Sequence, residues 1–127
     1  MTNTTFKQLN EIAQAIFDKK GFNILVLDVR GISTMTDYFI IAEGTVDRHV
    51  QALSGAVIDQ LAKEGQHPLH VDGNREAEWI VLDYGDLVVH LFIPELRQKY
   101  TLEELWQKGK IVDIQIDISK PVLKNYT

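Results

Sequence analysis

The side chains with the greatest chemical potential lie together in the stretch Trp79–Phe92. This stretch carries the carboxylates of Asp83 and Asp86, the imidazole of His90 and three aromatic rings. Gly85 begins a two-residue turn between two apolar runs, and glycine in that position is typical of a type II′ hairpin. Aromatic, imidazole and carboxylate groups on a hairpin suit recognition of another protein, because Trp and Tyr dominate binding hot spots.

The turn also predicts which residues share a face, because a two-residue connection sets the register of both strands. One face is apolar and is expected to be the core face: Ile80, Leu82, Tyr84, Leu87, Val89 and Leu91. On the other face Trp79 lies opposite Phe92, Val81 opposite His90, and Asp83 opposite Val88. If no helix covers this second face, we expect an exposed aromatic patch on a rigid sheet.

Metal chemistry is a weaker interpretation. His67, His70 and Asp72 have ligand-type side chains, but Pro68 breaks the helix that would align an i, i+3 pair, and a surface turn is favoured. The chain contains no cysteine, which excludes disulfides and thiolate sites. The sequence therefore predicts no metal and no cofactor.

Catalytic motifs are also missing. Gly109-Lys110 is followed by Ile111, so the phosphate-binding pattern GxxxxGK[ST] is not present. A Ser-His-Asp triad stays open by residue count, although none of the serines lies in a nucleophile motif: Ser33, Ser54 and Ser119.

The elements that position the hairpin follow from hydrophobic periodicity. It predicts a helix over Thr5–Lys20 and a second over Val46–Glu64. Strands are predicted at Ile24–Val29 and Tyr38–Ala42, and a short one at Leu69–Val71. The first two strands are apolar on both faces, which indicates a sheet covered on both sides.

Local signals mark the ends of these elements. Gly21 is expected to end the first helix, and Thr45 or Asp47 to cap the second. Pro94–Tyr100 reads as a short helix with proline at its start, and Thr101–Trp106 as a second that begins with a capping box.

The chain length of 127 residues fits one domain. We expect an α/β domain over residues 1–109, in which helices flank a mixed sheet, and an edge strand or extended tail over residues 110–127. The net charge of −5 argues against direct sequence-specific nucleic-acid binding. With no membrane-length apolar run and no secretory signal, a cytoplasmic location is expected.

Four ordered motifs carry a family resemblance. They are the hairpin Trp79–Phe92, the strand Asp37–Ala42, the segment Gly44–Val50 and the segment Arg97–Trp106. At this order and spacing they resemble the ribosomal silencing factor family, also called Iojap-like. The resemblance spans roughly Asp28 to Trp106, which is most of the chain.

The resemblance implies a specific function. Members of this family bind ribosomal protein L-fourteen on the large subunit, block joining of the small subunit and lower translation when nutrients are scarce. They are also described as homodimers. The resemblance implies a docking surface that includes Trp79, Tyr84, His90 and Phe92, with Asp83 and Asp86 as polar partners and Arg97 and Tyr100 at its border. The motif Asp47-Arg48-His49 is ambiguous, because a cap and an ion pair that hold the loop after Ala42 would explain it equally well.

The same residues have structural interpretations. A large aromatic such as Trp79 is usually covered in part by its own fold. His90 is a ready hydrogen-bond partner in a core, and Asp86 fits simple turn chemistry. Tyr84 falls on the core face in our register although the resemblance implies a contact, unless its hydroxyl reaches the rim.

The resemblance also implies a nucleotidyltransferase-like fold. The catalytic form of that fold uses a Gly-Ser pair and an Asp-x-Asp pair that holds magnesium, and this chain has neither. We therefore expect a protein without enzymatic activity. The two rival interpretations are a divergent nucleotidyltransferase and a large-subunit assembly factor that uses the same surface.

Overall fold

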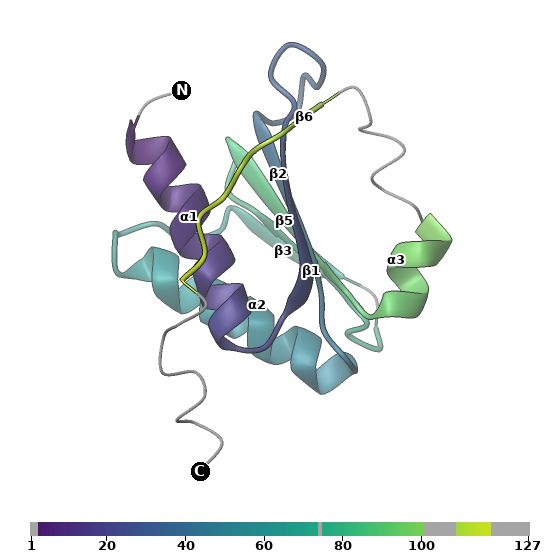
Figure 1. The fold of residues 1–127 in the computed structure, drawn as a ribbon. Helices are drawn as coiled ribbons and strands as arrows, with labels where there is room; N and C mark the ends of the chain where they lie inside the picture. Colours follow the sequence, from purple (N-terminus) through teal and green to yellow (C-terminus); the bar gives the residue numbers. More distant parts are fainter. Residues whose placement is uncertain (1–2, 74, 101–108, 118–127) are drawn as a thin grey trace.

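The chain folds into one layered α/β unit, seen in a computed structural model that describes residues 3–73, 75–100 and 109–117. The described elements are α1 (Asn3–Asp18), β1 (Phe22–Asp28), β2 (Tyr38–Glu43), α2 (Asp47–Ala62), β3 (His70–Gly73), β4 (Trp79–Asp83), β5 (Leu87–Phe92), α3 (Pro94–Tyr100) and β6 (Lys110–Ile111). The strands form one sheet in the order β3-β4-β5-β2-β1-β6. Helices α1 and α2 cover one face, and α3 lies on the other (Figure 1). The predicted α/β class with a mixed, helix-flanked sheet is confirmed.

The centre of the sheet is a parallel pair. β2 runs parallel to β5, from the pair Tyr38–Leu87 to the pair Glu43–Phe92, and the other named strand pairs are antiparallel. Every residue of β2 is buried, as the apolar run Tyr38–Ala42 predicts, and the burial extends to the carboxylate of Glu43. The hairpin of β4 and β5 is therefore anchored to the most deeply buried strand of the molecule.

The main core lies between the sheet and the two helices on its first face. The apolar stripes of α1 and α2 point inward, as their 3.6-residue periodicity predicts. The fully buried helix residues are Leu9, Ile12, Ala13, Ile16, Val50, Leu53, Val57 and Leu61. They meet the inward residues of the strands, which include Val26, Ile40, Leu82, Leu87, Val89 and Leu91. We call this side of the sheet the helix-pair face.

The register of the hairpin is the one predicted from its turn. Trp79 pairs with Phe92, Val81 with His90, and Asp83 with Val88. The amide of Tyr84 donates to the carbonyl of Leu87 at 2.9 Å and closes the turn. Gly85 has a φ of +89°, a conformation that glycine enters without steric cost.

The predicted helix ends were wrong in two places. Lys20, and not Gly21, takes the left-handed conformation after α1, with a φ of 68°. The amides of Lys20 and Gly21 donate to the carbonyls of Phe17 and Ile16, the two bonds of a Schellman motif. Val46 occupies the N-cap of α2 without a side-chain cap, so neither Thr45 nor Asp47 serves as the cap.

The C-terminal segment continues the sheet only briefly. β6 pairs with β1 through two residues, and Val112 then donates its amide to the carbonyl of Val26. Further along, the amides of Gln115 and Asp117 donate to the side chains of Asn10 and Gln14 on α1. The segment 110–117 thus lies as an extended strap against α1. The predicted helix Thr101–Trp106 and residues 118–127 lie outside the described residues.

The left-handed Lys20 generates a stability prediction. Replacing Lys20 with glycine removes the steric cost of this backbone conformation, which exceeds the entropy that glycine loses on folding. We expect Lys20→Gly to raise the free energy of unfolding by roughly 0.5–1 kcal/mol, measured by urea denaturation. Lys19→Gly is the matched control and should stabilise nothing, because Lys19 has no positive φ. A lower midpoint for Lys20→Gly would contradict this account.

Candidate functional site

The second face of the sheet, which we call the α3 face, gathers four rings. Alternation along the strands turns Trp79, His90 and Phe92 to this side, and Phe39 joins them from β2. The ring centres of Trp79 and Phe92 lie 5.4 Å apart, and those of Phe39 and His90 lie 5.3 Å apart. We call these four residues the aromatic cluster.

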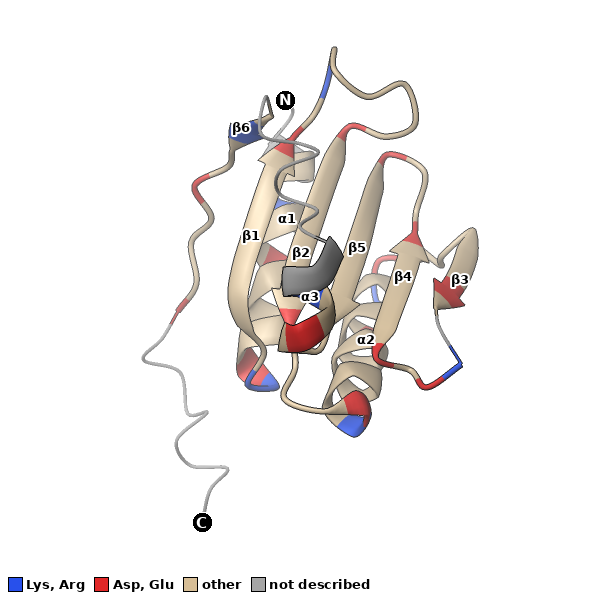
Figure 2. Cartoon of the chain, turned by 90° about the vertical axis from the view of Figure 1, so that its right-hand side faces the viewer, with Lys and Arg blue, Asp and Glu red and all other residues tan. Residues whose placement is uncertain are grey.

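The aromatic cluster is mostly closed. Phe92 is 0% exposed and His90 is 9% exposed, whereas Trp79 is half-buried. Leu96 of α3 packs against the same cluster, and α3 lies over this side of the sheet (Figure 2). The exposed aromatic patch that an uncovered face would have formed is therefore reduced to the open part of Trp79.

The imidazole of His90 is neutral at physiological pH. The indole Nε1–H of Trp79 donates to Nδ1 of His90 at 3.4 Å, so the proton of the neutral ring resides on Nε2. Burial lowers the pKa of His90 from 6.5 to about 4, because the charged form loses its hydration among aromatic rings. This imidazole therefore supports Trp79 as an acceptor and a stacked ring.

Arg97 fastens α3 to the sheet. Its guanidinium forms an ion pair with Glu43 at 3.1 Å, and it also donates to the carbonyl of Asn23. The side-chain amide Nδ2 of Asn23 donates to the same carboxylate at 3.1 Å. Both charged side chains are almost fully buried, and removing one partner of such a pair typically costs about 3–5 kcal/mol. Arg97, expected at the border of the docking surface, thus has internal partners that hold α3 in position.

The other predicted docking residues lie on different faces of the sheet. Tyr84 lies on the helix-pair face, where its hydroxyl is buried without a hydrogen-bond partner among the described residues, and burial raises its pKa. Asp83 accepts the amide of Gly85 at 2.8 Å and shares the α3 face with Trp79. Asp86 is exposed at the turn. Tyr100 belongs to α3, but its side chain lies outside the described set.

The loop after β2 is held by a histidine. The amide of Thr45 donates to Nδ1 of His49 at 2.8 Å, so Nε2 carries the proton and donates to the carbonyl of Lys19 at 2.7 Å. The cap and ion pair expected from Asp47 and Arg48 do not hold this loop. The carboxylate of Asp47 accepts the adjacent backbone amide of Arg48 instead.

Sequence reasoning missed two residues of this site. The sequence predicts Phe39 only as part of a buried strand, and it links Glu43 to no partner. The alternation of β2 was a usable signal for Phe39, since it shares a face with Ile41. No local signal connects Glu43 to Arg97, because the contact depends on how α3 returns to the sheet.

The described residues contain no group of three or more His, Cys, Asp or Glu side chains that would hold a metal ion. The hydroxyl of Ser33 accepts the amide of Met35, and that of Ser54 donates to the carbonyl of Gln51. Ser33 is thus engaged in a local turn and Ser54 in a bond to the backbone of its own helix α2, while Ser119 lies outside the described residues. The α3 face thus offers side chains suited to binding a partner, on a rigid sheet that supports them.

Comparisons with known proteins decide the family. The chain matches the family model described as "Ribosomal silencing factor during starvation" over residues 2–125. It belongs to that family. The resemblance inferred from four motifs is confirmed, and the family is one of regulatory factors. Among the described residues, every helix is too short or too polar to span a bilayer.

Individual relatives agree with this assignment. The ribosomal silencing factor RsfS of Bacillus subtilis is 38% identical over 108 residues, which are 85% of this chain and 92% of the relative. A crystal structure of a protein from Chromobacterium violaceum superposes with a TM-score of 0.75 at 30% identity, covering 95% of this chain and 98% of that one. The mouse protein named "Mitochondrial assembly of ribosomal large subunit protein 1" is 34% identical over 91 residues, 66% of this chain and 38% of its own length.

The neutral, buried His90 predicts a pH dependence of stability. The unfolded chain takes up a proton near pH 6.5, whereas the folded chain resists it until about pH 4. The contribution to stability is therefore complete above pH 6.5 and is lost as the pH falls toward 4, by about 3 kcal/mol in all. Urea denaturation between pH 7.5 and 4.5 measures this loss.

His90→Gln should flatten that pH dependence, because glutamine does not titrate in this range. His67→Gln is the matched control and should leave the dependence as in the wild type, since His67 is exposed. An unchanged slope in His90→Gln would show that other groups cause the acid sensitivity.

Proposed function

We propose that this chain is a ribosomal silencing factor that binds the large subunit through ribosomal protein L-fourteen, blocks joining of the small subunit and represses translation when nutrients are scarce. Membership of the family supports this proposal. The observation that carries the docking mode is the half-buried indole of Trp79, stacked on the buried ring of Phe92 within the aromatic cluster. A steric blocker needs such a rigid anchor and requires no catalytic group.

The proposed docking surface centres on Trp79. The indole stacks on the ring of Phe92, and its Nε1–H donates to His90. Because these contacts already fix the side chain, it loses little conformational entropy on binding. Asp83 lies on the same face and Asp86 at the adjoining turn, where they supply a polar rim. A partner that covers the open part of Trp79 and extends along β4 to the turn would bury an aromatic anchor and also meet both carboxylates.

The remaining predicted residues have supporting roles in this proposal. His90 and Phe92 fix the indole, and Arg97 fixes the helix that borders it. Tyr84 supports the surface from the helix-pair face by packing against the core. Tyr100 is proposed to border the docking surface, as the resemblance implies.

The charge of the chain agrees with a basic protein partner. At a net charge of −5, long-range attraction speeds encounter with a positively charged surface and weakens as salt is added. We also propose that the protein acts in the cytoplasm, as expected from its sequence, and that it forms homodimers, as the resemblance implies. Sedimentation equilibrium at micromolar concentration tests the dimer: a single monomeric mass would remove that part.

A role in large-subunit assembly is the second candidate. It is favoured by the mouse relative, whose name refers to assembly of the mitochondrial large subunit. The two roles differ in cells: an assembly factor predicts that immature large subunits accumulate in a deletion strain even in rich medium. A silencer predicts normal large subunits there, with a defect confined to starvation.

The silencing proposal predicts a specific effect of Trp79→Ala. Truncating a central aromatic anchor typically costs 2 kcal/mol or more, so we expect the variant to bind the large subunit about 30-fold more weakly. Purified subunits are mixed with the protein and whole ribosomes are followed by sucrose-gradient sedimentation. The wild type should travel with the large subunit and reduce whole ribosomes, and Trp79→Ala should do neither.

Met35→Ala is the matched control, because Met35 is 83% exposed on a loop away from the aromatic cluster, and it should act as the wild type. Circular dichroism verifies that both variants are folded. Normal activity of folded Trp79→Ala would refute the anchor, and unchanged joining with the wild type would refute the silencer. In that last case magnesium-dependent nucleotide binding, measured by calorimetry, tests the divergent enzyme.

A further inference from the structure

β3 lies at one end of the sheet, next to β4 only. Its four residues, His70–Gly73, are all exposed. Among the described residues no strand pairs with its outer side. An edge of this kind presents unpaired backbone groups, which another extended chain can bind.

The register shows which backbone groups point outward. In an antiparallel ladder, every second residue of a strand directs its backbone N–H and C=O toward the same neighbouring strand. Because Tyr84 bonds to Leu87, the backbone groups of Leu82 and Ile80 also point toward β5. Those of Asp83 and Val81 therefore point toward β3. Their partners on β3 are His70 and Asp72, whose backbone groups therefore point toward β4. The amide and carbonyl of Val71 consequently face the open edge.

The next residue that points outward is Gly73, and its backbone N–H already has a partner. The carboxylate of Asp72 accepts the amide of Gly73 at 2.8 Å. The edge therefore offers the amide and carbonyl of Val71 and the carbonyl of Gly73. These groups are enough for a short ladder of hydrogen bonds with one added strand.

Apolar side chains flank the open backbone. Val71 is 58% exposed and Leu69 is 66% exposed. Large apolar side chains of this kind are usually covered by a neighbouring strand or by a binding partner. An added strand with an apolar residue at every second position would shield them while its backbone pairs with Val71.

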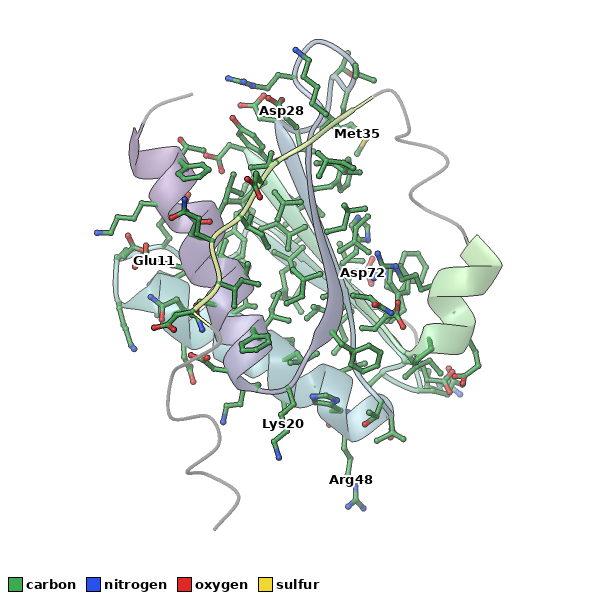
Figure 3. The ribbon with its side chains drawn as sticks, in the orientation of Figure 1. Glu11, Lys20, Asp28, Met35, Arg48 and Asp72 are labelled. Carbon is green, nitrogen blue, oxygen red and sulfur yellow. The ribbon has the colours of Figure 1, made fainter. Side chains whose placement is uncertain are left out.

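The surroundings of this edge are acidic. Asp72 lies on the α3 side of the sheet (Figure 3), as does Asp83, its diagonal neighbour on β4. Glu76 and Glu78 lie in the connection to β4, where Arg75 is the only cation among the described residues (Figure 2). A second copy of this chain would bring the same carboxylates into contact, whereas a chain with Lys or Arg at alternate positions would neutralise them.

We propose that the open edge of β3 binds an extended basic segment of a protein partner as an additional strand. The segment alternates cationic residues, which lie on the α3 side next to Asp72 and His70, with apolar residues, which cover Val71 and Leu69; Asp83 adds negative charge one strand further in. Backbone pairing supplies affinity and the charges select the partner. This inference goes beyond the proposed function, because it concerns a different surface and holds for any partner with such a segment.

A defined peptide tests the edge directly. The probe is an end-blocked peptide of alternating Lys and Val, eight residues long, titrated into nitrogen-15-labelled protein and followed by amide chemical shifts. We expect saturable shifts at residues 69–73 that weaken with added salt, and at least about tenfold weaker binding by a peptide of alternating Glu and Val. No shifts at residues 69–73 with the lysine peptide would overturn the proposal.

Two variants separate backbone pairing from side-chain contact. Val71→Pro removes the outward amide, and proline is tolerated on an edge strand at such a position. It should reduce peptide binding about tenfold or more while the rest of the amide spectrum is retained. Val71→Ala keeps the amide and should lose about threefold or less.

Equal binding by Val71→Pro and the wild type would overturn the added-strand geometry. Shifts at residues 69–73 that depend on protein concentration without peptide would assign the edge to a second copy and also overturn the proposal. The titration contains no ribosome, so its failure is distinct from a failure of large-subunit binding by the wild type.

Discussion

The two-residue turn at Gly85 is the constraint on which the rest of this structure depends. It sets the pairing of β4 with β5, and a slip of one residue would exchange their faces. With the observed pairing, Leu82, Val89 and Leu91 complete the core under α1 and α2. The same pairing turns Trp79, His90 and Phe92 to the α3 face. One local conformation thus determines both the main core and the candidate docking surface.

The α3 face combines rigidity with a small opening. Its rings are packed together, and its one imidazole stays neutral because burial makes the charged form costly. The ion pair of Glu43 with Arg97 joins β2 to α3, so the helix that borders Trp79 is tied to the most buried strand. A protein that works by steric blocking benefits from this arrangement, because a preorganised surface loses little entropy on binding.

The acidic character of the chain connects its two proposed surfaces. Asp83 lies on the α3 face at the opposite end of β4 from Trp79, and it is the diagonal neighbour of Asp72 across the β3–β4 ladder. A basic partner that extends from Trp79 along β4 would therefore meet carboxylates that continue to the open edge of the sheet. The two surfaces differ in mechanism, since one uses a fixed aromatic side chain and the other uses unpaired backbone groups.

The sequence by itself determined what depends on neighbouring residues. The stripe of α1 gave its buried face, the turn at Gly85 gave the hairpin register, and the ordered motifs gave the family. Periodicity and turn chemistry act over a few residues, so they are readable without a fold. The ends of the helices did not follow from local signals alone, because Lys20 takes the left-handed conformation that the adjacent Gly21 would be expected to take.

Only the tertiary structure decided which predicted site residues are exposed. Trp79, Phe92 and His90 look alike as recognition residues in the sequence, but packing on the α3 face buries the last two and leaves Trp79 partly open. Arg97 received buried partners from β1 and β2, far away along the chain. Burial and long-range pairing arise from the packing of distant segments, and no local pattern encodes them.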